Sequence, residues 1–357
     1  MTTDLLALTA DLVDIASVSR DEGAITAYFE AHLRDVPGLD VTRVGDNLVA
    51  RTDLGRPYRL ILAGHTDTVP PNGNERARVE GDTLHGVGSA DMKSGLAVML
   101  DAARTIAEPA VDVTYVFYAR EEVAASESGL QELFDARPDL LVGDAALLGE
   151  PTDGVLEAGC QGTMRIRVVL AGERSHTARP WVGRNAIHRV GGILVDLSVY
   201  DERQPEIDGC RYREALQAVR VEGGVAGNVV PDRVELVLNH RFAPDRSAAQ
   251  AEAHVREVLE PWIQPGDEVE VVDVADAAAP ALDHPLISTL VARNDLPVRA
   301  KLGWTDVARF AQRGIPAANF GPGDAEIAHT AGELVHADQL VRVARAIGDV
   351  LRHGPAS

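Results

Sequence analysis

Three short apolar segments of this sequence each lead directly into histidine or acidic side chains. The segments and the residues after them are Leu60–Ala63 with His65 and Asp67, Val111–Ala119 with Glu121 and Glu122, and Ala145–Leu148 with Glu150. An apolar run without alternation is typical of a strand that is buried on both faces, in a sheet covered by helices. Because open α/β sheets bind ligands beyond the carboxyl ends of their strands, we expect these polar side chains to meet at one edge of a sheet.

The length, charge and cysteine content of the chain exclude several classes of protein. Its 357 residues suggest two domains at roughly 150 residues each. The 55 acidic residues outnumber the 34 lysines and arginines and give a net charge of -21, so the surface does not attract nucleic acid or anionic lipid. Two cysteines, Cys160 and Cys210, are too few for a disulfide framework. With neither a basic leader nor an apolar stretch of about 20 residues, the sequence predicts a cytoplasmic protein without nucleic-acid or membrane partners.

The middle of the chain has a different pattern from its two ends. Its expected strands are Met164–Leu170, Gln217–Glu222, Val234–Arg241 and Val269–Val274, and its expected helices are Asn185–Val199 and Ser247–Leu259. This pattern predicts an α+β insertion over residues 162–275, within an α/β domain made of residues 1–161 and 276–357. Near the N-terminus, Ser19 followed by Glu22 resembles a capping box at the start of a second helix.

The polar residues after the strands are of the types that ligate transition metals. Imidazole together with carboxylate suits zinc, cobalt or manganese. A carboxylate has two oxygens, so one shared carboxylate lets a small set of side chains hold two ions about 3.5 to 4 Å apart. Asp91 is the candidate for the shared position, because it lies among small residues that permit a close approach before an apolar helix.

The short motifs also indicate roles beyond ligation. His65 and Asp67 flank one residue, so on an extended strand both side chains point the same way, and Asp67 can orient the imidazole. Glu121 and Glu122 diverge on an extended backbone, so one can ligate a metal while the other acts as a base. Taken singly, each motif has a plainer interpretation, such as a surface pair, a solvated acidic turn or the end of a strand. His329 is likewise only one of 11 histidines.

Five motifs recur along the chain in the order of a known family. They are Gly64-His65-Thr66-Asp67-Thr68-Val69-Pro70, Ser89-Ala90-Asp91-Met92-Lys93, Glu121-Glu122, Gly149-Glu150-Pro151 and Ala328-His329-Thr330. They resemble the dinuclear zinc deacylases and exopeptidases, a family that includes aminoacylase and acetylornithine deacetylase, and the resemblance covers nearly the whole chain. It implies a zinc-exopeptidase-like catalytic domain, in which helices flank a mixed sheet. It also implies two bound divalent metal ions, with zinc expected and cobalt as the alternative.

The resemblance assigns roles to individual residues. One zinc would be held by His65 and Glu150 and the other by Glu122 and His329, with Asp91 bridging both. Glu121 would be the general base, and Asp67 would support His65. Two departures from the family pattern affect neighbouring loops: Val87 replaces a common arginine, and Gly332 leaves open whether Glu333 faces inward.

The inserted segment carries motifs of its own. They are Ser175-His176-Thr177-Ala178-Arg179-Pro180, Gly227-Asn228-Val229-Val230-Pro231 and Asn239-His240-Arg241-Phe242. In the family this segment is a ferredoxin-like lid and dimerisation domain, and its histidine donates to the tetrahedral oxyanion in the partner's active site. The resemblance implies a homodimer, His176 as that donor, and Asn228 and Arg241 as substrate contacts. A satisfied surface histidine, a turn and a surface salt bridge are the plainer alternatives.

Two motifs near the C-terminus are most similar to the desuccinylase branch of the family. They are Gly303-Trp304-Thr305-Asp306-Val307-Ala308-Arg309-Phe310 and Phe320-Gly321-Pro322-Gly323. This resemblance implies removal of the succinyl group from N-succinyl-LL-2,6-diaminopimelate, a small-molecule N-acyl amino acid, in lysine and diaminopimelate biosynthesis. The extra carboxylate of a succinyl group needs a cationic or hydrogen-bonding pocket, for which Arg241, Thr305 and Gly323 are candidates. A sibling deacylase such as acetylornithine deacetylase, a di-zinc exopeptidase and a catalytically silent binding protein stay open as alternatives.

Overall fold

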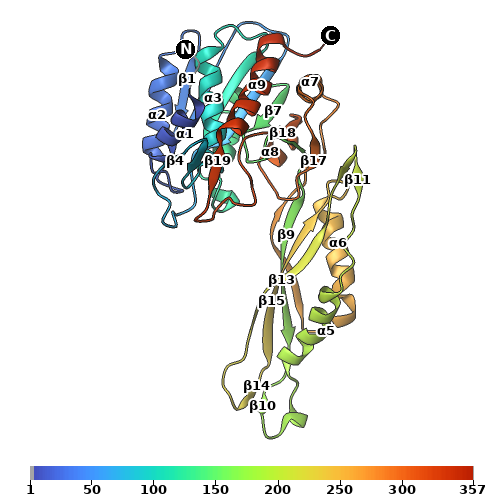
Figure 1. The fold of residues 1–357 in the computed structure, drawn as a ribbon. Helices are drawn as coiled ribbons and strands as arrows, with labels where there is room; N and C mark the ends of the chain where they lie inside the picture. The colour runs from blue at the N-terminus through green and yellow to red at the C-terminus, as the bar shows by residue number, and fades with distance from the viewer. Residues whose placement is uncertain (1–3, 357) are drawn as a thin grey trace. The chain divides into compact units, whose positions relative to one another are not determined.

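The chain forms two compact units in the computed structural model, which describes residues 4–356 (Figure 1). The large unit comprises the residues up to Ala158, Pro280–Arg299 and the residues from Arg309 onward. The small unit comprises Gly159–Ala279 and Ala300–Ala308, so it extends slightly beyond the expected insertion at 162–275. It also contains residues 300–308, which the sequence analysis assigns to the large domain. This segment joins the small unit through a hydrogen bond from Gln161 N to Lys301 O at 3.2 Å.

The large unit is built on an eight-stranded mixed sheet. Its strands in spatial order are β1 (Asp40–Val44), β2 (Asn47–Arg51), β6 (Asp112–Tyr118), β3 (Arg59–His65), β7 (Ala145–Leu148), β18 (Ala317–Asn319), β8 (Leu156–Ala158) and β17 (Val298–Ala300). β3 is parallel to β6 and β7, and β18 is parallel to β7, whereas β2 runs antiparallel to β6. All residues of β6 and β7 are buried, which confirms that these apolar runs are central strands.

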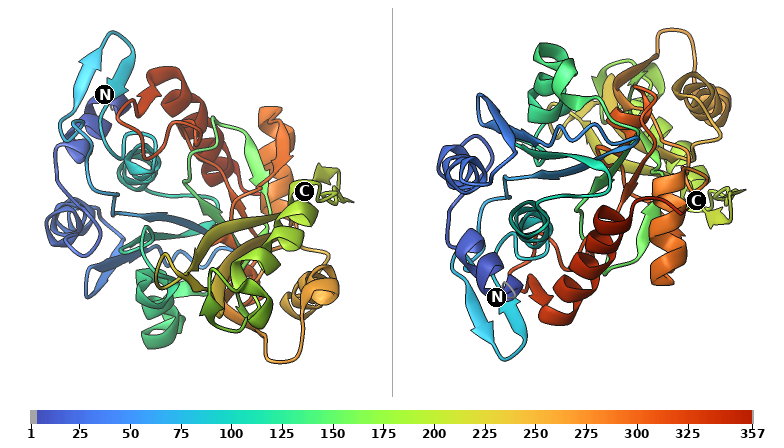
Figure 2. Two further views of the ribbon diagram at one scale, coloured as in Figure 1. Left: turned by 90° about the horizontal axis from the view of Figure 1, so that it is seen from below. Right: turned by 90° about the horizontal axis from the view of Figure 1, so that it is seen from above.

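Helices cover both faces of this sheet. They are α1 (Leu5–Val13), α2 (Gly23–Arg34), α3 (Lys93–Thr105), α4 (Gly129–Ala136), α7 (Pro285–Asn294) and α9 (Ala337–His353), with α8 (Val307–Ala311) crossing into the small unit and short turns η1 (Ala125–Glu127) and η2 (Pro138–Leu141). α1, α3 and α9 pack together on one face, and α4 lies on the other (Figure 2). A three-stranded sheet of β4 (Arg78–Glu80), β5 (Thr83–His85) and β19 (Leu334–His336) completes the unit. Among residues 4–356, no helix combines the length and the apolar character needed to cross a membrane.

The start of α2 differs from the expectation of a capping box. The helix begins at Gly23, and Glu22 occupies the N-cap position without a side-chain capping bond. The Ser19 hydroxyl instead donates to Asp67 Oδ2 at 2.7 Å, and Glu22 Oε1 accepts from Arg20 N at 2.9 Å. The capping-box prediction is therefore wrong, because both side chains are used in contacts outside the helix.

The small unit is an α+β sandwich with a four-stranded antiparallel sheet. Its main elements along the chain are β9 (Gly162–Ala171), α5 (Ala186–Ser198), β13 (Ala215–Gly223), β15 (Arg233–Phe242), α6 (Ala248–Leu259) and β16 (Glu268–Ala275). The strands lie in the order β13-β15-β9-β16, which with the chain order β-α-β-β-α-β is a ferredoxin-like topology. Alternate residues of β9, such as Met164, Ile166 and Val168, pack against the two helices to form the core. Shorter elements are β10 (Ser175–His176), η3 (Pro180–Val182), β11 (Glu206–Ile207), β12 (Cys210–Arg211), β14 (Val229–Val230) and η4 (Glu260–Trp262).

Candidate metal centre

Three parallel strands of the large unit end at the same edge of the sheet. The register pairs His65 at the end of β3 with Tyr118 at the end of β6, and pairs Ala63 with Leu148 at the end of β7. The acidic residues that follow β6 and β7 therefore emerge next to His65, as the sequence predicts. The start of α3 reaches this edge as well, because Gly95 packs so closely that a Cβ there would lie 2.2 Å from Gly149 O.

Three groups of potential metal ligands meet at this edge: two share Asp91, and the third comprises His65, Glu121 and Glu122. Of the two that share Asp91, His65, Asp91 and Glu150 form one, and Asp91, Glu122 and His329 form the other, with the ligand atoms of each group within 4.8 Å of one another. Asp91 belongs to both groups because its two oxygens face different histidines. Oδ1 lies 3.1 Å from His65 Nε2, and Oδ2 lies 3.4 Å from His329 Nε2. This set of imidazole nitrogens and carboxylate oxygens fits two neighbouring divalent ions that share Asp91.

In the metal-free protein, hydrogen bonds between the imidazoles and the carboxylates hold these side chains together. Hydrogen bonds to Asp91 and Glu122 raise the pKa of His329 from 6.5 to about 10. Burial opposes the protonation of His65, but hydrogen bonds to Asp67 and Asp91 raise its pKa well above the ordinary value. Burial also disfavours the charged form of Asp91, yet the two histidines hold its pKa well below its usual range. These raised pKa values favour the protonated form of both imidazoles in the metal-free protein.

We expect metal binding to release protons from both histidines. A metal binds only the neutral imidazole, so loading at pH 7 must remove the protons that His65 and His329 carry in the metal-free protein. Because protons compete with the metal for these nitrogens, the apparent affinity for zinc should rise with pH below about 10, the raised pKa of His329, and level off above it. Calorimetric titrations in buffers of different ionisation enthalpy measure this release directly. A titration without proton release would contradict protonated histidines.

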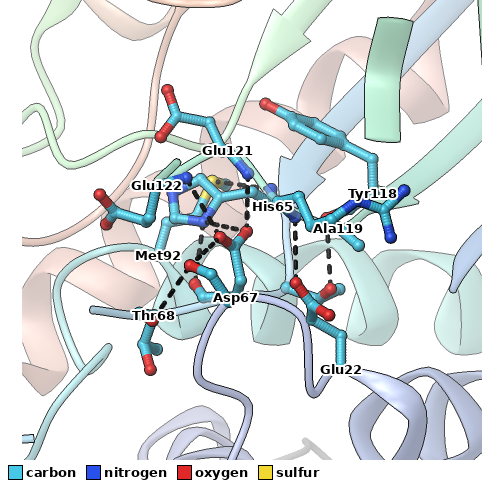
Figure 3. A network of polar contacts seen from close by, with 12 residues as sticks. Glu22, His65, Asp67, Thr68, Met92, Tyr118, Ala119, Glu121 and Glu122 are labelled. Carbon is cyan, nitrogen blue, oxygen red and sulfur yellow. Dashed lines mark hydrogen bonds and ion pairs between the residues drawn. The ribbon is translucent and has the colours of Figure 1, made fainter. Parts of the chain in front are cut away.

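Asp67 has a wider role than the predicted support of His65 (Figure 3). The His65 Nδ1 atom lies 3.0 Å from the Asp67 main-chain oxygen and 3.5 Å from its carboxylate. The carboxylate instead accepts from the backbone amides of Glu121 at 2.9 Å and Glu122 at 3.1 Å, and from the Ser19 hydroxyl at 2.7 Å. Burial opposes ionisation, but these donors and His65 lower the Asp67 pKa to about 2. Asp67 therefore links the His65 strand to the loop that carries both glutamates.

Glu121 and Glu122 enter the cluster in different ways. Glu122 Oε1 lies 2.8 Å from His329 Nε2 and belongs to the group around Asp91 and His329. A Glu121 carboxylate oxygen lies within 4.8 Å of ligand atoms of His65 and Glu122, but Glu121 is not in either group that contains Asp91. This geometry supports Glu122 as ligand and Glu121 as base, and the two roles stay predictions.

Glu333 is a candidate site residue whose direction the sequence left undecided. Its side chain is only 1% exposed, and Oε1 accepts from Ala90 N at 2.9 Å and from Asp91 N at 3.0 Å. Glu333 thereby fixes the loop that presents the shared carboxylate. Gly323, predicted to contact substrate, lies against the same loop, because a Cβ at its φ of +85° would come within 2.8 Å of Ala90. The sequence signal for Glu333 is its place in the motif that begins at His329.

Lys93, which the sequence analysis names only as part of a motif, is also buried near the cluster. Its ammonium group is buried and donates to Ile15 O at 2.7 Å, joining the start of α3 to the segment after α1. Burial lowers the Lys93 pKa to about 8. Its position two residues after Asp91 in the same motif is the signal that would have identified it.

Four predicted site residues belong to the small unit. His176 is exposed on β10, and its Nδ1 accepts from Ala178 N at 3.0 Å, so the neutral ring carries its proton on Nε2. Asn228 lies beside it, because Thr177 N donates to Asn228 O at 3.1 Å. Arg241 is partly buried near the end of β15 and has no ion-pair partner among the residues that the structure describes. Thr305 is buried, and its main-chain oxygen accepts from Cys160 Sγ at 3.8 Å.

The sequence and the fold both match known proteins. Residues 61–353 match the profile described as Peptidase family M20/M25/M40. A relative from Mycobacterium tuberculosis, named as a succinyl-diaminopimelate desuccinylase (DapE), is 51% identical over 333 residues, 93% of each chain. A succinyl-diaminopimelate desuccinylase from Corynebacterium glutamicum is 45% identical over 354 residues, covering 98% of this chain and 96% of its own. Among solved structures, the aminopeptidase PepT from Bacillus cereus superposes with a TM-score of 0.78 at 20% identity, covering 98% of this chain and 97% of its own.

Proposed function

Because this chain belongs to peptidase family M20/M25/M40, we propose that it removes the succinyl group from N-succinyl-LL-2,6-diaminopimelate as a metal-dependent amide hydrolase. The products would be succinate and LL-diaminopimelate, an intermediate of lysine biosynthesis. The observation that carries the proposal is the pair of ligand groups sharing Asp91, in a chain 51% identical over 93% of its length to a relative named for this activity. The cytoplasm is the expected site of action.

The side chains of the large unit suit this reaction. Two divalent ions, zinc or alternatively cobalt, would polarise the amide carbonyl and lower the pKa of the attacking water. Glu121 would take a proton from that water and deliver it to the leaving amine. Asp67 would keep Glu121 in place through its hydrogen bond to the Glu121 amide. His176, with its Nε2 proton available, would donate to the oxyanion that develops on the carbonyl.

Arg241 supports recognition of a carboxylate-bearing acyl group. Burial and the neighbouring Arg165 lower its pKa, so the guanidinium is a partly desolvated cation without a neutralising carboxylate. Such a group gains most from an anionic ligand, and its planar shape matches a carboxylate. We therefore assign Arg241 to a carboxylate of the substrate, with Thr305, Asn228 and Gly323 as further contacts.

Turnover on succinyl and acetyl substrates tests both the activity and the role of Arg241. The metal-loaded protein is expected to hydrolyse N-succinyl-diaminopimelate well and N-acetylornithine poorly. Arg241→Ala should raise KM for the succinyl substrate by about 10- to 100-fold, the loss of one charge-assisted hydrogen bond, with a smaller change in kcat. Arg233→Ala, at the other end of β15 and paired with Glu235 at 3.1 Å, is the matched control. Preference for the acetyl substrate would identify a sibling deacylase instead.

The surface of the small unit supports a homodimer. Four apolar side chains of α5 and its C-terminal end are exposed: Ile187, Leu194, Val195 and Val199. The edge strand β13 adds exposed Val219 and Val221, and β15 is its one neighbour in the sheet. An apolar helix face beside an open strand edge is suited to pairing with a second copy, which would cover both. In such a dimer His176 would serve the active site of the partner.

A further inference from the structure

The loop that carries Glu121 and Glu122 is held by an unusual set of acceptors. Four consecutive backbone amides after β6 each donate to a side chain, and Figure 3 shows Asp67 beside the two glutamates whose amides it accepts from. The pairs are Ala119 N with Asn47 Oδ1 at 2.9 Å, Arg120 N with Glu22 Oε1 at 3.2 Å, Glu121 N with Asp67 Oδ1 at 2.9 Å, and Glu122 N with Asp67 Oδ2 at 3.1 Å. We call Glu22, Asn47 and Asp67 the amide clamp.

The amide clamp takes the place of strand pairing for the backbone amides of residues 119–122. β6 pairs with β3 as far as Tyr118, and beyond that residue the chain has no strand partner. Arg120 there adopts a φ of +61°, a conformation that disfavours residues other than glycine. The three clamp residues come from different parts of the fold: the start of α2, the start of β2 and the segment after β3. Together they impose a backbone path that the loop does not prefer by itself.

The clamp residues are costly to bury. Glu22, Asn47 and Asp67 are each 0% exposed, and burial raises the pKa of Glu22. The backbone of a partly exposed loop can be satisfied by water without burying carboxylates. Glu22 Oε2 has no hydrogen-bond partner among the described residues, so Oε1, which serves Arg20 and Arg120, is the useful atom. Two buried carboxylates and a buried amide therefore each accept hydrogen bonds from this one short loop.

We propose that Glu22 and Asn47 are positioning residues for the hydrolysis, because they hold residues 119–122 so that the Glu121 carboxylate points at the attacking water. This inference rests on the proposed function, in which Glu121 is the base. Glu22 and Asn47 act on the two amides that precede Glu121, and Asp67 acts on the two that follow. A displaced loop would leave the metal ligands outside it, such as His65 and Glu150, untouched.

The test compares variants that remove an acceptor with one that keeps it. Glu22→Ala and Asn47→Ala each leave one amide of the loop without its acceptor, whereas Glu22→Gln retains an oxygen for Arg120 N. Asp112→Ala is the matched control, because buried Asp112 at the opposite end of β6 also accepts from two loop amides, Leu54 N and Arg56 N, both at 2.8 Å. All variants are measured for kcat, KM, metal content and melting temperature.

A positioning role predicts a specific pattern. Glu22→Ala and Asn47→Ala should lower kcat by about 10- to 100-fold, with KM within about 3-fold of the wild type, since small misplacements of a reacting group have effects of this size. Glu22→Gln should recover most of kcat. Asp112→Ala should lower the melting temperature and leave kcat unchanged. In the metal-free protein, amide hydrogen exchange over residues 119–122 should be faster in both alanine variants and unchanged in the control.

Several outcomes would overturn the inference. Wild-type kcat in folded Glu22→Ala and Asn47→Ala would show that the clamp serves stability alone. Unchanged hydrogen exchange at residues 119–122 would show that these side chains do not hold the loop. An equal loss of kcat in Glu22→Gln and Glu22→Ala would remove the acceptor role of Oε1. A wild type without desuccinylase activity would count against the proposed function, while hydrogen exchange would still decide whether the clamp holds the loop.

Discussion

Replacing Glu121 by glutamine is expected to lower kcat by about 10²- to 10⁴-fold while both metal ions stay bound. The substitution removes the proton acceptor but keeps the size of the side chain. Glu121 is not in either ligand group that contains Asp91, so we expect the pair of ions to stay bound without its carboxylate. Steady-state kinetics and metal analysis of the purified variant measure the two effects separately.

Glu122→Gln provides the matched comparison for this prediction. Glu122 lies in the group with Asp91 and His329, and its Oε1 is 2.8 Å from His329 Nε2. Its loss should therefore release one metal as well as activity. If Glu121→Gln released a metal and Glu122→Gln retained both, the two roles would be exchanged. If both variants kept full turnover, neither glutamate would serve the reaction.

Replacing His176 by alanine is expected to lower kcat by about 10²- to 10³-fold without changing metal content. The expected size is that of a lost oxyanion donor in other hydrolases. The hydrogen bond from Ala178 N to Nδ1 leaves Nε2–H as the donor of the neutral ring. Because His176 belongs to the small unit and the metal ligands to the large unit, its removal should not disturb them.

Mixed dimers show whether His176 acts in the partner's site. A dimer of one His176→Ala subunit and one Glu121→Gln subunit should contain one working site if His176 acts across the interface, and none if it acts within its own chain. The control pairs His176→Ala with a subunit that carries both substitutions, which should stay inactive in either case. No recovery in the first mixture would remove the shared site from the proposal. Full turnover in homodimeric His176→Ala would remove the histidine from the mechanism.

The position of the candidate ligands at the strand ends was predictable from local sequence. An uninterrupted apolar run predicts a buried strand, and parallel strands end at a common edge, so His65 and Glu150 had to emerge close together. The α+β character of the middle segment followed in the same way from alternating strands and amphipathic helices. Both predictions succeeded because burial and periodicity are properties of a short stretch of chain.

The capping-box prediction, which failed, and the direction of Glu333, which stayed open, concern side chains that form hydrogen bonds with residues far away in the sequence. Ser19 and Glu22 have the spacing of a capping box, yet the structure uses them for Asp67 and for the amides of Arg20 and Arg120. Glu333 follows a glycine that obscured its direction, and it accepts a hydrogen bond from Asp91 N, 242 positions away in sequence. A local pattern shows which bonds a side chain is able to make, but not which distant groups compete for it.

The sequence by itself determined the types of candidate ligand, their order along the chain and the strands that present them, because these depend on residue identity and hydrophobic periodicity. Tertiary structure decided that Asp91 faces both histidines and that Asp67, Glu22 and Asn47 hold the glutamate loop. The physical reason is that a hydrogen bond depends on distances of about 3 Å, which only the packing of the whole unit defines.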